Sequence, residues 1–135
     1  MRDKSFEVSV VTPEGAVVET RATSVVFPAF DGQYGVLPNH APLVTLLGIG
    51  ELRVVGEGGT TERFYVDGGF AQFADGELSL VTEQAKPLDQ LDPTEPQRLL
   101  EEARGMKTPD ADAAAARDAM FQRAWVQERL AGKPS

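Results

Sequence analysis

Apolar and polar residues alternate along most of the chain before residue 86. Phe6, Val8 and Val10 alternate with polar residues, a period of two that predicts a half-buried strand. Short runs of this kind recur, and each ends at a cluster of Gly, Pro or Asp residues that is typical of a turn. The predicted strands cover residues 5–12, 16–19, 22–27, 34–37, 43–47, 51–55, 60–66, 70–73 and 77–82.

About nine short strands, with a turn roughly every eight to twelve residues, predict an all-β sandwich or flattened barrel. Alternation within the strands indicates which side chains face the core. Leu52 and Val54 form one inward pair, and Phe64 and Val66 form another. The run at 43–47 is strongly apolar and is expected to be a buried strand.

A second pattern begins at Lys86–Pro87, after which Gly becomes rare and Ala, Glu, Arg and Leu become frequent. This change divides the chain into a sandwich domain over residues 1–86 and a helical domain over residues 87–135. Start and stop signals predict two helices in the second domain, one over residues 92–105 and one over residues 109–130. A short connection between them predicts an antiparallel hairpin.

The helical hairpin is expected to depend on a neighbouring surface. Asp92 is the predicted cap of its first helix, because Pro93 follows it and Glu95 stands three residues later. Phe121 and Trp125 are the bulkiest side chains of the second helix and are expected to form the hairpin core. Two helices alone bury little apolar area. The hairpin should therefore pack against another part of the chain or against a partner.

Composition excludes several functional classes. The chain has 135 residues, of which 21 are acidic and 13 basic, so its formal net charge is −8; this argues against binding to nucleic acid or to an anionic lipid surface. It has no cysteine, which excludes disulfides and thiol chemistry. No secretory signal is visible, and the longest apolar stretch is too short to cross a bilayer. We therefore expect a cytosolic protein without direct membrane insertion.

Residues 31–43 are the strongest candidate for a functional loop. They combine shaped turns with His40, the only histidine of the chain. One histidine without cysteine or a clustered acidic pair predicts no metal site and no catalytic residues, and no nucleophile elbow, P-loop or dinucleotide motif occurs. His40 is then a turn residue bonded to a backbone carbonyl, a partner contact, or both. Two alternatives are a stand-alone sandwich that binds a small ligand at this loop and a hydrolase that uses His40.

The order of four motifs identifies a resemblance to a known family. They are V-V-T-P-E-G at 10–15, S-V-V-F-P-A-F-D-G-Q-Y-G-V-L-P-N-H-A-P-L-V-T at 24–45, G-E-L-R-V at 50–54 and F-Y-V-D-G-G-F-A-Q-F at 64–73. With these motifs the chain closely resembles the epsilon subunit of F-type ATP synthases, whose mitochondrial counterpart is called delta. The resemblance in sequence covers about residues 5–86.

This resemblance implies a sandwich of about ten strands followed by a helical hairpin. It implies a non-catalytic rotor subunit of the central stalk, which binds the gamma subunit and the c-ring and couples proton translocation to ATP synthesis. The hairpin would reach the alpha and beta subunits of the catalytic head and could restrain ATP hydrolysis. The subunit would lie peripherally at the cytoplasmic face of a bacterial plasma membrane. The implied contact residues are Asp31, Gly32, Gln33, Tyr34, Asn39, His40, Ala41 and Pro42.

The resemblance also bears on a cofactor. The rotor role requires none, but some bacterial members bind regulatory ATP through an I-D-x-x-R-A pattern at the start of the first helix. Asp92 matches the Asp of that pattern, and Arg98 lies nearby, so these two residues are the candidates for ATP contact. Glu95 and Pro96 stand where the pattern has Arg and Ala, which argues against ATP binding in this chain.

Overall fold

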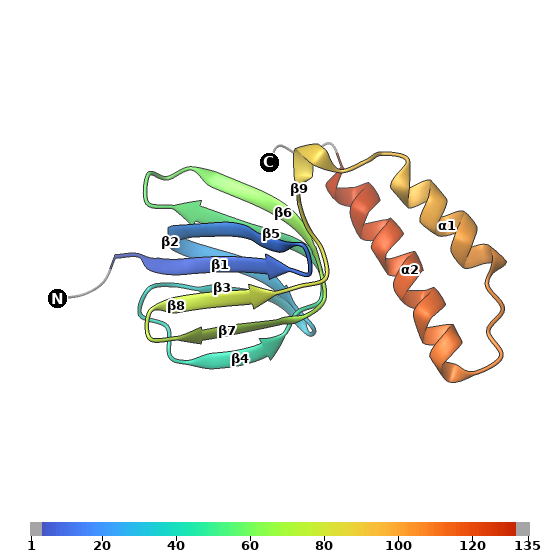
Figure 1. The fold of residues 1–135 in the computed structure, drawn as a ribbon, viewed down its shortest axis with the longest axis horizontal. Helices are drawn as coiled ribbons and strands as arrows, with labels where there is room; N and C mark the ends of the chain where they lie inside the picture. The colour runs from blue at the N-terminus through green and yellow to red at the C-terminus, as the bar shows by residue number, and fades with distance from the viewer. Residues whose placement is uncertain (1–3, 132–135) are drawn as a thin grey trace.

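A folded-over β-sheet and a helical hairpin make up the protein (Figure 1). The computed structural model describes residues 4–131. The first three residues of the predicted sandwich domain and the last four of the predicted helical domain lie outside this range. The strands are β1 (Phe6–Thr12), β2 (Gly15–Ala29), β3 (Gly32–Val36), β4 (Leu43–Leu46), β5 (Ile49–Gly56), β6 (Thr61–Asp67), β7 (Phe70–Ala74), β8 (Glu77–Val81) and β9 (Ala85–Pro87). A 3-10 turn, η1 (Leu88–Gln90), precedes the helices α1 (Glu95–Gly105) and α2 (Ala111–Leu130).

The strand order is β4-β7-β8-β1-β2-β5-β6-β9, with β3 paired to β2. Strand β2 takes part in both layers, because it pairs with β1 along its first half and with β3 and β5 along its second half. The two strands predicted at 16–19 and 22–27 are one strand, since Thr20 and Arg21 continue the pairing with β1. The described residues therefore contain nine strands where the resemblance implied about ten.

The core lies between the two layers and consists of the inward residues of each strand. Phe6, Leu52, Val54, Phe64 and Val66 are all buried, so the predicted inward positions are confirmed. Burial of each such side chain stabilises the fold by about 2 kcal/mol. The cluster is completed by Val8, Val10, Val18, Ala22, Val25, Phe27, Ala29, Val36, Leu47, Ala71, Phe73, Leu78 and Leu80.

Strand β4 is an edge strand, and the prediction of a buried strand at 43–47 is wrong for half of its side chains. Leu43 and Thr45 face the core, whereas Val44 and Leu46 are 71% and 62% exposed. The strand pairs only with β7, which leaves its other edge unpaired, and no other element of the described part covers the face that carries Val44 and Leu46. An apolar run cannot by itself distinguish a strand covered on both faces from one that leaves an apolar face uncovered.

The two predicted helices are present, but the first begins later than expected. Asp92 is not its N-cap: its carboxylate accepts hydrogen bonds from the backbone N–H and the hydroxyl of Thr94, at 2.8 and 2.7 Å. Thr94 is the cap position and makes no side-chain capping bond. Asp110 caps α2 by accepting from the N–H of Ala113 at 2.8 Å. An Asp near two prolines can close a local turn instead of capping a helix.

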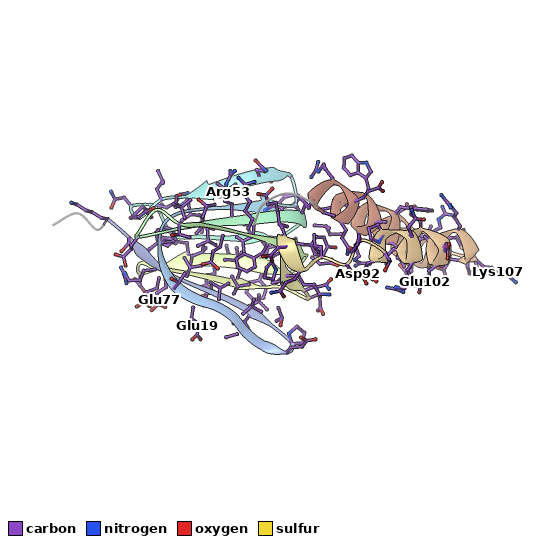
Figure 2. All side chains as sticks on the ribbon, turned by 90° about the horizontal axis from the view of Figure 1, so that it is seen from above. Glu19, Arg53, Glu77, Asp92, Glu102 and Lys107 are labelled. Carbon is purple, nitrogen blue, oxygen red and sulfur yellow. The ribbon has the colours of Figure 1, made fainter. Side chains whose placement is uncertain are left out.

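Only the C-terminal part of α2 packs closely on the strands, and the rest of the hairpin projects away from them (Figures 1 and 2). The prediction that Trp125 lies in the hairpin core is wrong. Its side chain is 63% exposed, and the Arg129 guanidinium lies 5.0 Å from the ring centroid. Ala124 and Val126 are the buried neighbours. The inner face of α2 is thus formed by Ala124, Val126, Gln127 and Leu130, and Trp125 lies on the outer face.

Gly69 occupies a position that only glycine can fill without strain. Its φ is +101°, and a Cβ placed there would lie 1.8 Å from the carbonyl oxygen of Val81. We expect Gly69→Ala to lower the free energy of unfolding by about 3 kcal/mol or more, because backbone atoms must move to admit the methyl group. Urea denaturation measures the change. Gly58→Ala is the matched control, since a Cβ at Gly58 meets open space; equal losses in the two variants would contradict the argument.

Candidate partner-binding site

The predicted contact residues lie at the two ends of strand β3 (Figure 1). Asp31 lies in the turn between β2 and β3, Gly32 and Gln33 are the first residues of β3, and all three are exposed. The corner 39–42 lies at the other end, before β4, and is also largely exposed. Tyr34 connects the two groups, because its hydroxyl lies 2.9 Å from Nε2 of His40.

His40 forms hydrogen bonds on both sides of its ring. Nδ1 lies 2.6 Å from the carbonyl oxygen of Ala41, and because a carbonyl only accepts, Nδ1 carries a proton. In the neutral ring Nε2 then accepts from the hydroxyl of Tyr34. The structure thus gives His40 the backbone bond expected of a turn residue.

A chain of aromatic contacts links this surface to the core. The ring of Tyr34 stacks on Phe27 at a centroid distance of 5.6 Å and meets His40 edge-on at 5.5 Å. His40 lies 6.1 Å from Phe73, which in turn meets Phe6 at 5.5 Å. Phe27, Phe73 and Phe6 are core residues. The exposed corner is therefore held by side chains that are themselves fixed by packing.

A second candidate surface was missed by sequence reasoning. Exposed apolar side chains lie side by side across the strands: Leu46 pairs with Phe70, Phe70 with Val81, and Val81 with Val11. Phe30 extends the row, since its N–H donates to the carbonyl of Leu46 at 3.1 Å. We call Phe30, Leu46, Phe70, Val81 and Val11 the outer apolar row.

Sequence signals for this row existed but were ambiguous. In β4 the positions of both faces carry apolar residues, a pattern that predicted a buried strand at 43–47. In β8 only Val81 is apolar on the outer face. The opposite end of the same sheet face carries three carboxylates, since Glu7, Glu19 and Glu77 line a depression of about 390 Å³ together with one cation, Arg21. Figure 2 labels Glu19 and Glu77. The open face therefore combines an apolar row with a negatively charged end.

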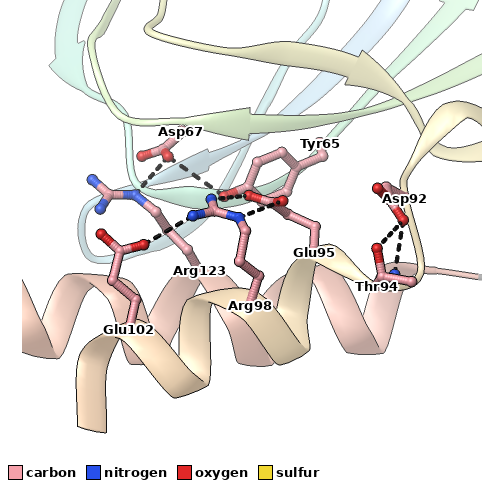
Figure 3. Close-up of polar contacts among 8 residues, drawn as sticks. All are labelled: Tyr65, Asp67, Asp92, Thr94, Glu95, Arg98, Glu102 and Arg123. Carbon is pink, nitrogen blue, oxygen red and sulfur yellow. Dashed lines mark hydrogen bonds and ion pairs between the residues drawn. The ribbon is translucent and has the colours of Figure 1, made fainter. Parts of the chain in front are cut away.

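The third feature is the contact between the hairpin and the sandwich, which we call the hairpin foot (Figure 3). Asp67 accepts a hydrogen bond from Nε of Arg123 at 2.7 Å, and the hydroxyl of Tyr65 lies 3.5 Å from the same carboxylate oxygen. Val126 and Leu130 pack beside Tyr65 in a separate buried cluster that also includes Leu88. The hairpin foot consists of Tyr65, Asp67, Leu88, Arg123, Val126 and Leu130.

The foot lies next to the predicted contact turn. Gly32 and Gln33 share the lining of a cavity of about 390 Å³ with Arg129 and Leu130 at the end of α2. The turn and the docked hairpin therefore form one continuous surface.

The two candidate ATP residues point to other partners within the chain (Figure 3). Arg98 is held by Glu95 and Glu102, and its guanidinium holds the pKa of Glu95 below the ordinary value. Hydrogen bonds from Thr94 likewise lower the pKa of Asp92. The structure does not bring Asp92 and Arg98 into one common contact network.

Within residues 4–131, no three metal-ligating side chains gather at one point. The hydrogen bonds of His40 go to the hydroxyl of Tyr34 and to the backbone carbonyl of Ala41.

Comparison with known proteins identifies the family. The family model described as ATP synthase, Delta/Epsilon chain, beta-sandwich domain matches residues 5–88. The chain belongs to this family. As a delta/epsilon chain it is a rotor subunit of an F-type ATP synthase, which confirms the resemblance drawn from the motifs and replaces the ligand-binding and hydrolase alternatives.

Curated relatives of this delta/epsilon chain extend the match beyond the sandwich. The ATP synthase epsilon chain of Rhodopirellula baltica is 40% identical over 125 residues, which is 93% of this chain and 97% of that protein. The epsilon chain of Rhizobium meliloti is 40% identical over 101 residues, 75% of each chain. The homologues are subunits of the synthase and are not its catalytic ones.

Solved structures confirm the fold. A chain in a structure of the Euglena gracilis mitochondrial ATP synthase with OSCP, F1 and c-ring superposes with a TM-score of 0.81 at 24% identity, covering 96% of this chain and 82% of that one. A chain of the Tetrahymena thermophila central stalk and c-ring gives a TM-score of 0.70 at 12% identity, covering 96% and 98%. Among the described residues no helix is both long and apolar enough to span a bilayer.

The alkaline limit of stability tests the burial of Tyr65 in the foot. Burial raises the pKa of Tyr65 from its ordinary 10.0 to about 12. Because the folded state holds the phenol proton more tightly than the unfolded state, this contribution is complete below pH 10 and is lost as the pH rises toward 12. We expect the chain to lose roughly 2 to 3 kcal/mol of stability over that interval, measured by urea denaturation at each pH.

Tyr65→Phe is the control for this titration, since it removes the ionisable group and keeps the ring. The variant should lose less stability than the parent chain between pH 10 and 12. Parallel losses in both proteins would show that other groups cause the alkaline effect.

Proposed function

We propose that this chain is a non-catalytic rotor subunit that docks on the gamma subunit through the outer apolar row and couples rotation of the c-ring to ATP synthesis. The observation that carries the proposal is that row. Phe30 and Leu46 are 70% and 62% exposed, and large apolar side chains in register across one open sheet face are typical of a protein interface.

The charge of the open face adds a requirement for its partner. Glu7, Glu19 and Glu77 lie beyond the apolar row on the same sheet. Arg21 pairs with Glu7 at 3.6 Å. A partner that covers both parts needs an apolar stripe with basic residues beside it, because the carboxylates that Arg21 does not pair are costly to desolvate. We propose that the gamma subunit presents such a surface.

The turn and corner around β3 are proposed to contact the c-ring and the foot of the gamma subunit. The contact residues are those implied by the resemblance: Asp31, Gly32, Gln33, Tyr34, Asn39, His40, Ala41 and Pro42. A rotor must transmit torque without yielding, and the aromatic contacts from His40 and Tyr34 into the core supply a stiff mounting for these residues. This rigidity supports a mechanical role.

The two parts of the chain are proposed to have different roles, one in docking and one in regulation. Residues 1–86 would dock on the rotor, and residues 87–135 would regulate by reaching the alpha and beta subunits and restraining ATP hydrolysis. The limited contact between hairpin and sandwich supports an element that can detach. The chain would have no active site of its own, and it would lie at the cytoplasmic face of the membrane by way of its partners.

Regulatory ATP binding stays a prediction of the resemblance alone. Asp92 and Arg98 would have to exchange their present partners, Thr94, Glu95 and Glu102, before they could contact a nucleotide. This competition argues against ATP binding while the hairpin is docked.

The outer apolar row can be tested with the isolated chain and a purified gamma subunit. Leu46→Glu and Phe70→Glu each place a charge in the centre of the proposed interface. We expect either change to weaken association by about tenfold or more, measured by isothermal titration calorimetry.

Trp125→Glu is the matched control, because it also replaces a large exposed apolar residue with Glu, but on the hairpin. It should leave the affinity for gamma within about twofold of the parent chain. An unchanged affinity in both row variants would exclude this face as the gamma site.

The rigid corner predicts a separate effect on coupling. His40→Ala removes the bond to Tyr34 and one member of the aromatic chain, so the corner should loosen. In the assembled synthase we expect less proton pumping per ATP hydrolysed, measured by quenching of a pH-sensitive dye in vesicles. Glu62→Ala, at an exposed position of β6, is the control; a normal pumping ratio in His40→Ala would remove the mechanical role of the corner.

A further inference from the structure

The hairpin is attached to the sandwich at one small site. The contacts of α2 with the sheet are made with β5 and β6, and the residues that make them lie in the last two turns of the helix, from Arg123 to Leu130. The opposite end of the hairpin, around residues 105–111, is remote from the strands (Figures 1 and 2). The docked position therefore depends on the few side chains of the foot.

The polar part of the foot is a close ion pair between elements that are distant in sequence. Nε of Arg123 lies 2.7 Å from Oδ2 of Asp67, and the two residues are 56 positions apart in the sequence. The Asp67 side chain is 11% exposed and that of Arg123 is 36% exposed. Asp67 is fixed in the sheet, since its backbone N–H donates to the hydroxyl of Thr82 at 3.2 Å. The carboxylate thus belongs to the sandwich, and its cation comes from the hairpin.

The unequal burial of the two groups has an energetic consequence. If the hairpin stays docked without the Arg123 side chain, the Asp67 carboxylate is left largely buried without its cation, which is costly. If Asp67 loses its charge, Arg123 is exposed enough to reach water. The charge on Asp67 therefore opposes docking unless Arg123 is present.

We propose that the Asp67–Arg123 ion pair is the latch that decides whether the hairpin is docked on the sandwich. The apolar residues of the foot provide contact area. The ion pair makes docking favourable only when Arg123 lies beside the Asp67 carboxylate. The regulatory meaning of the latch rests on the proposed function, because only in a synthase would a detached hairpin reach the catalytic head. The latch itself is a property of the isolated chain.

The chain is suited to a direct measurement. It contains one tryptophan and no cysteine, so Trp125 on α2 is a unique donor, and Glu62→Cys on the exposed side of β6 provides a unique site for an acceptor dye. Energy transfer in the isolated full-length chain then reports the docked fraction. Far-UV circular dichroism checks that each variant is folded.

The latch predicts how the ratio of undocked to docked hairpin differs among four variants. Arg123→Gln should raise the ratio of undocked to docked hairpin by about tenfold or more, the effect of losing a charged hydrogen bond. Asp67→Asn should raise it less, because no charge is left buried. The double variant Asp67→Asn/Arg123→Gln should dock better than Arg123→Gln alone. Arg104→Gln, which makes the same charge change at an exposed position of α1, should have no effect.

A second readout uses Tyr65. When the hairpin leaves, the hydroxyl of Tyr65 is uncovered, and its pKa should fall from about 12 toward the ordinary 10.0, measured by tyrosinate absorbance. The fall should be largest in Arg123→Gln and absent in Arg104→Gln.

Two results would overturn the latch. One is equal energy transfer in Arg123→Gln and Arg104→Gln. The other is a double variant that undocks more than Arg123→Gln, which would show that the charge on Asp67 does not oppose docking. If Arg123→Gln does not fold, Asp67→Asn and the double variant are each compared with Arg104→Gln, and equal energy transfer in all three would overturn the latch. Because all measurements use the isolated chain, a failed latch leaves gamma binding untouched, and failed gamma binding leaves the latch untouched.

Discussion

The pairing of strand β2 with three neighbours is the interaction on which the rest of the structure depends. Its first half belongs to the layer of β1, and its second half carries β3 and β5. At its end, Ala29 bridges to Leu47, and the carbonyl of Pro28 accepts from the N–H of Gly48 at 2.8 Å. One continuous backbone thus joins both layers and fixes where β3 and β4 begin.

This arrangement explains why the docking features lie where they do. Phe30 follows β2 directly and joins the outer apolar row through Leu46, while the turn at Gly32 continues into β3 and leads to Tyr34. The rigid core reaches the surface through Tyr34 and His40. The outer apolar row and the turn into β3 are therefore built on a single backbone segment, so a load on either is carried by the same packed core.

The hairpin, unlike the sandwich, is held by few contacts with the rest of the chain. Its buried residues include the small Ala103 and Ala124 as well as Leu99, Val126 and Leu130, and its contact with the sandwich is confined to the foot. A rigid sandwich with a hairpin attached at one small site suits the division of roles that we propose for the two parts of the chain.

The sequence by itself determined the strand periods, the turn positions, the two helices and the family. Inward residues such as Leu52 and Val54 followed from alternation, because the backbone geometry of a strand imposes it. Tertiary structure alone decided which faces stay open. Val44 and Leu46 look like core residues until their face of β4 is seen to be uncovered, and Trp125 looks like core until Ala124 and Val126 on either side of it are seen to be the buried residues. The pairing of Asp67 with Arg123 was equally hidden, since burial and long-range contacts depend on how distant segments pack and not on local pattern.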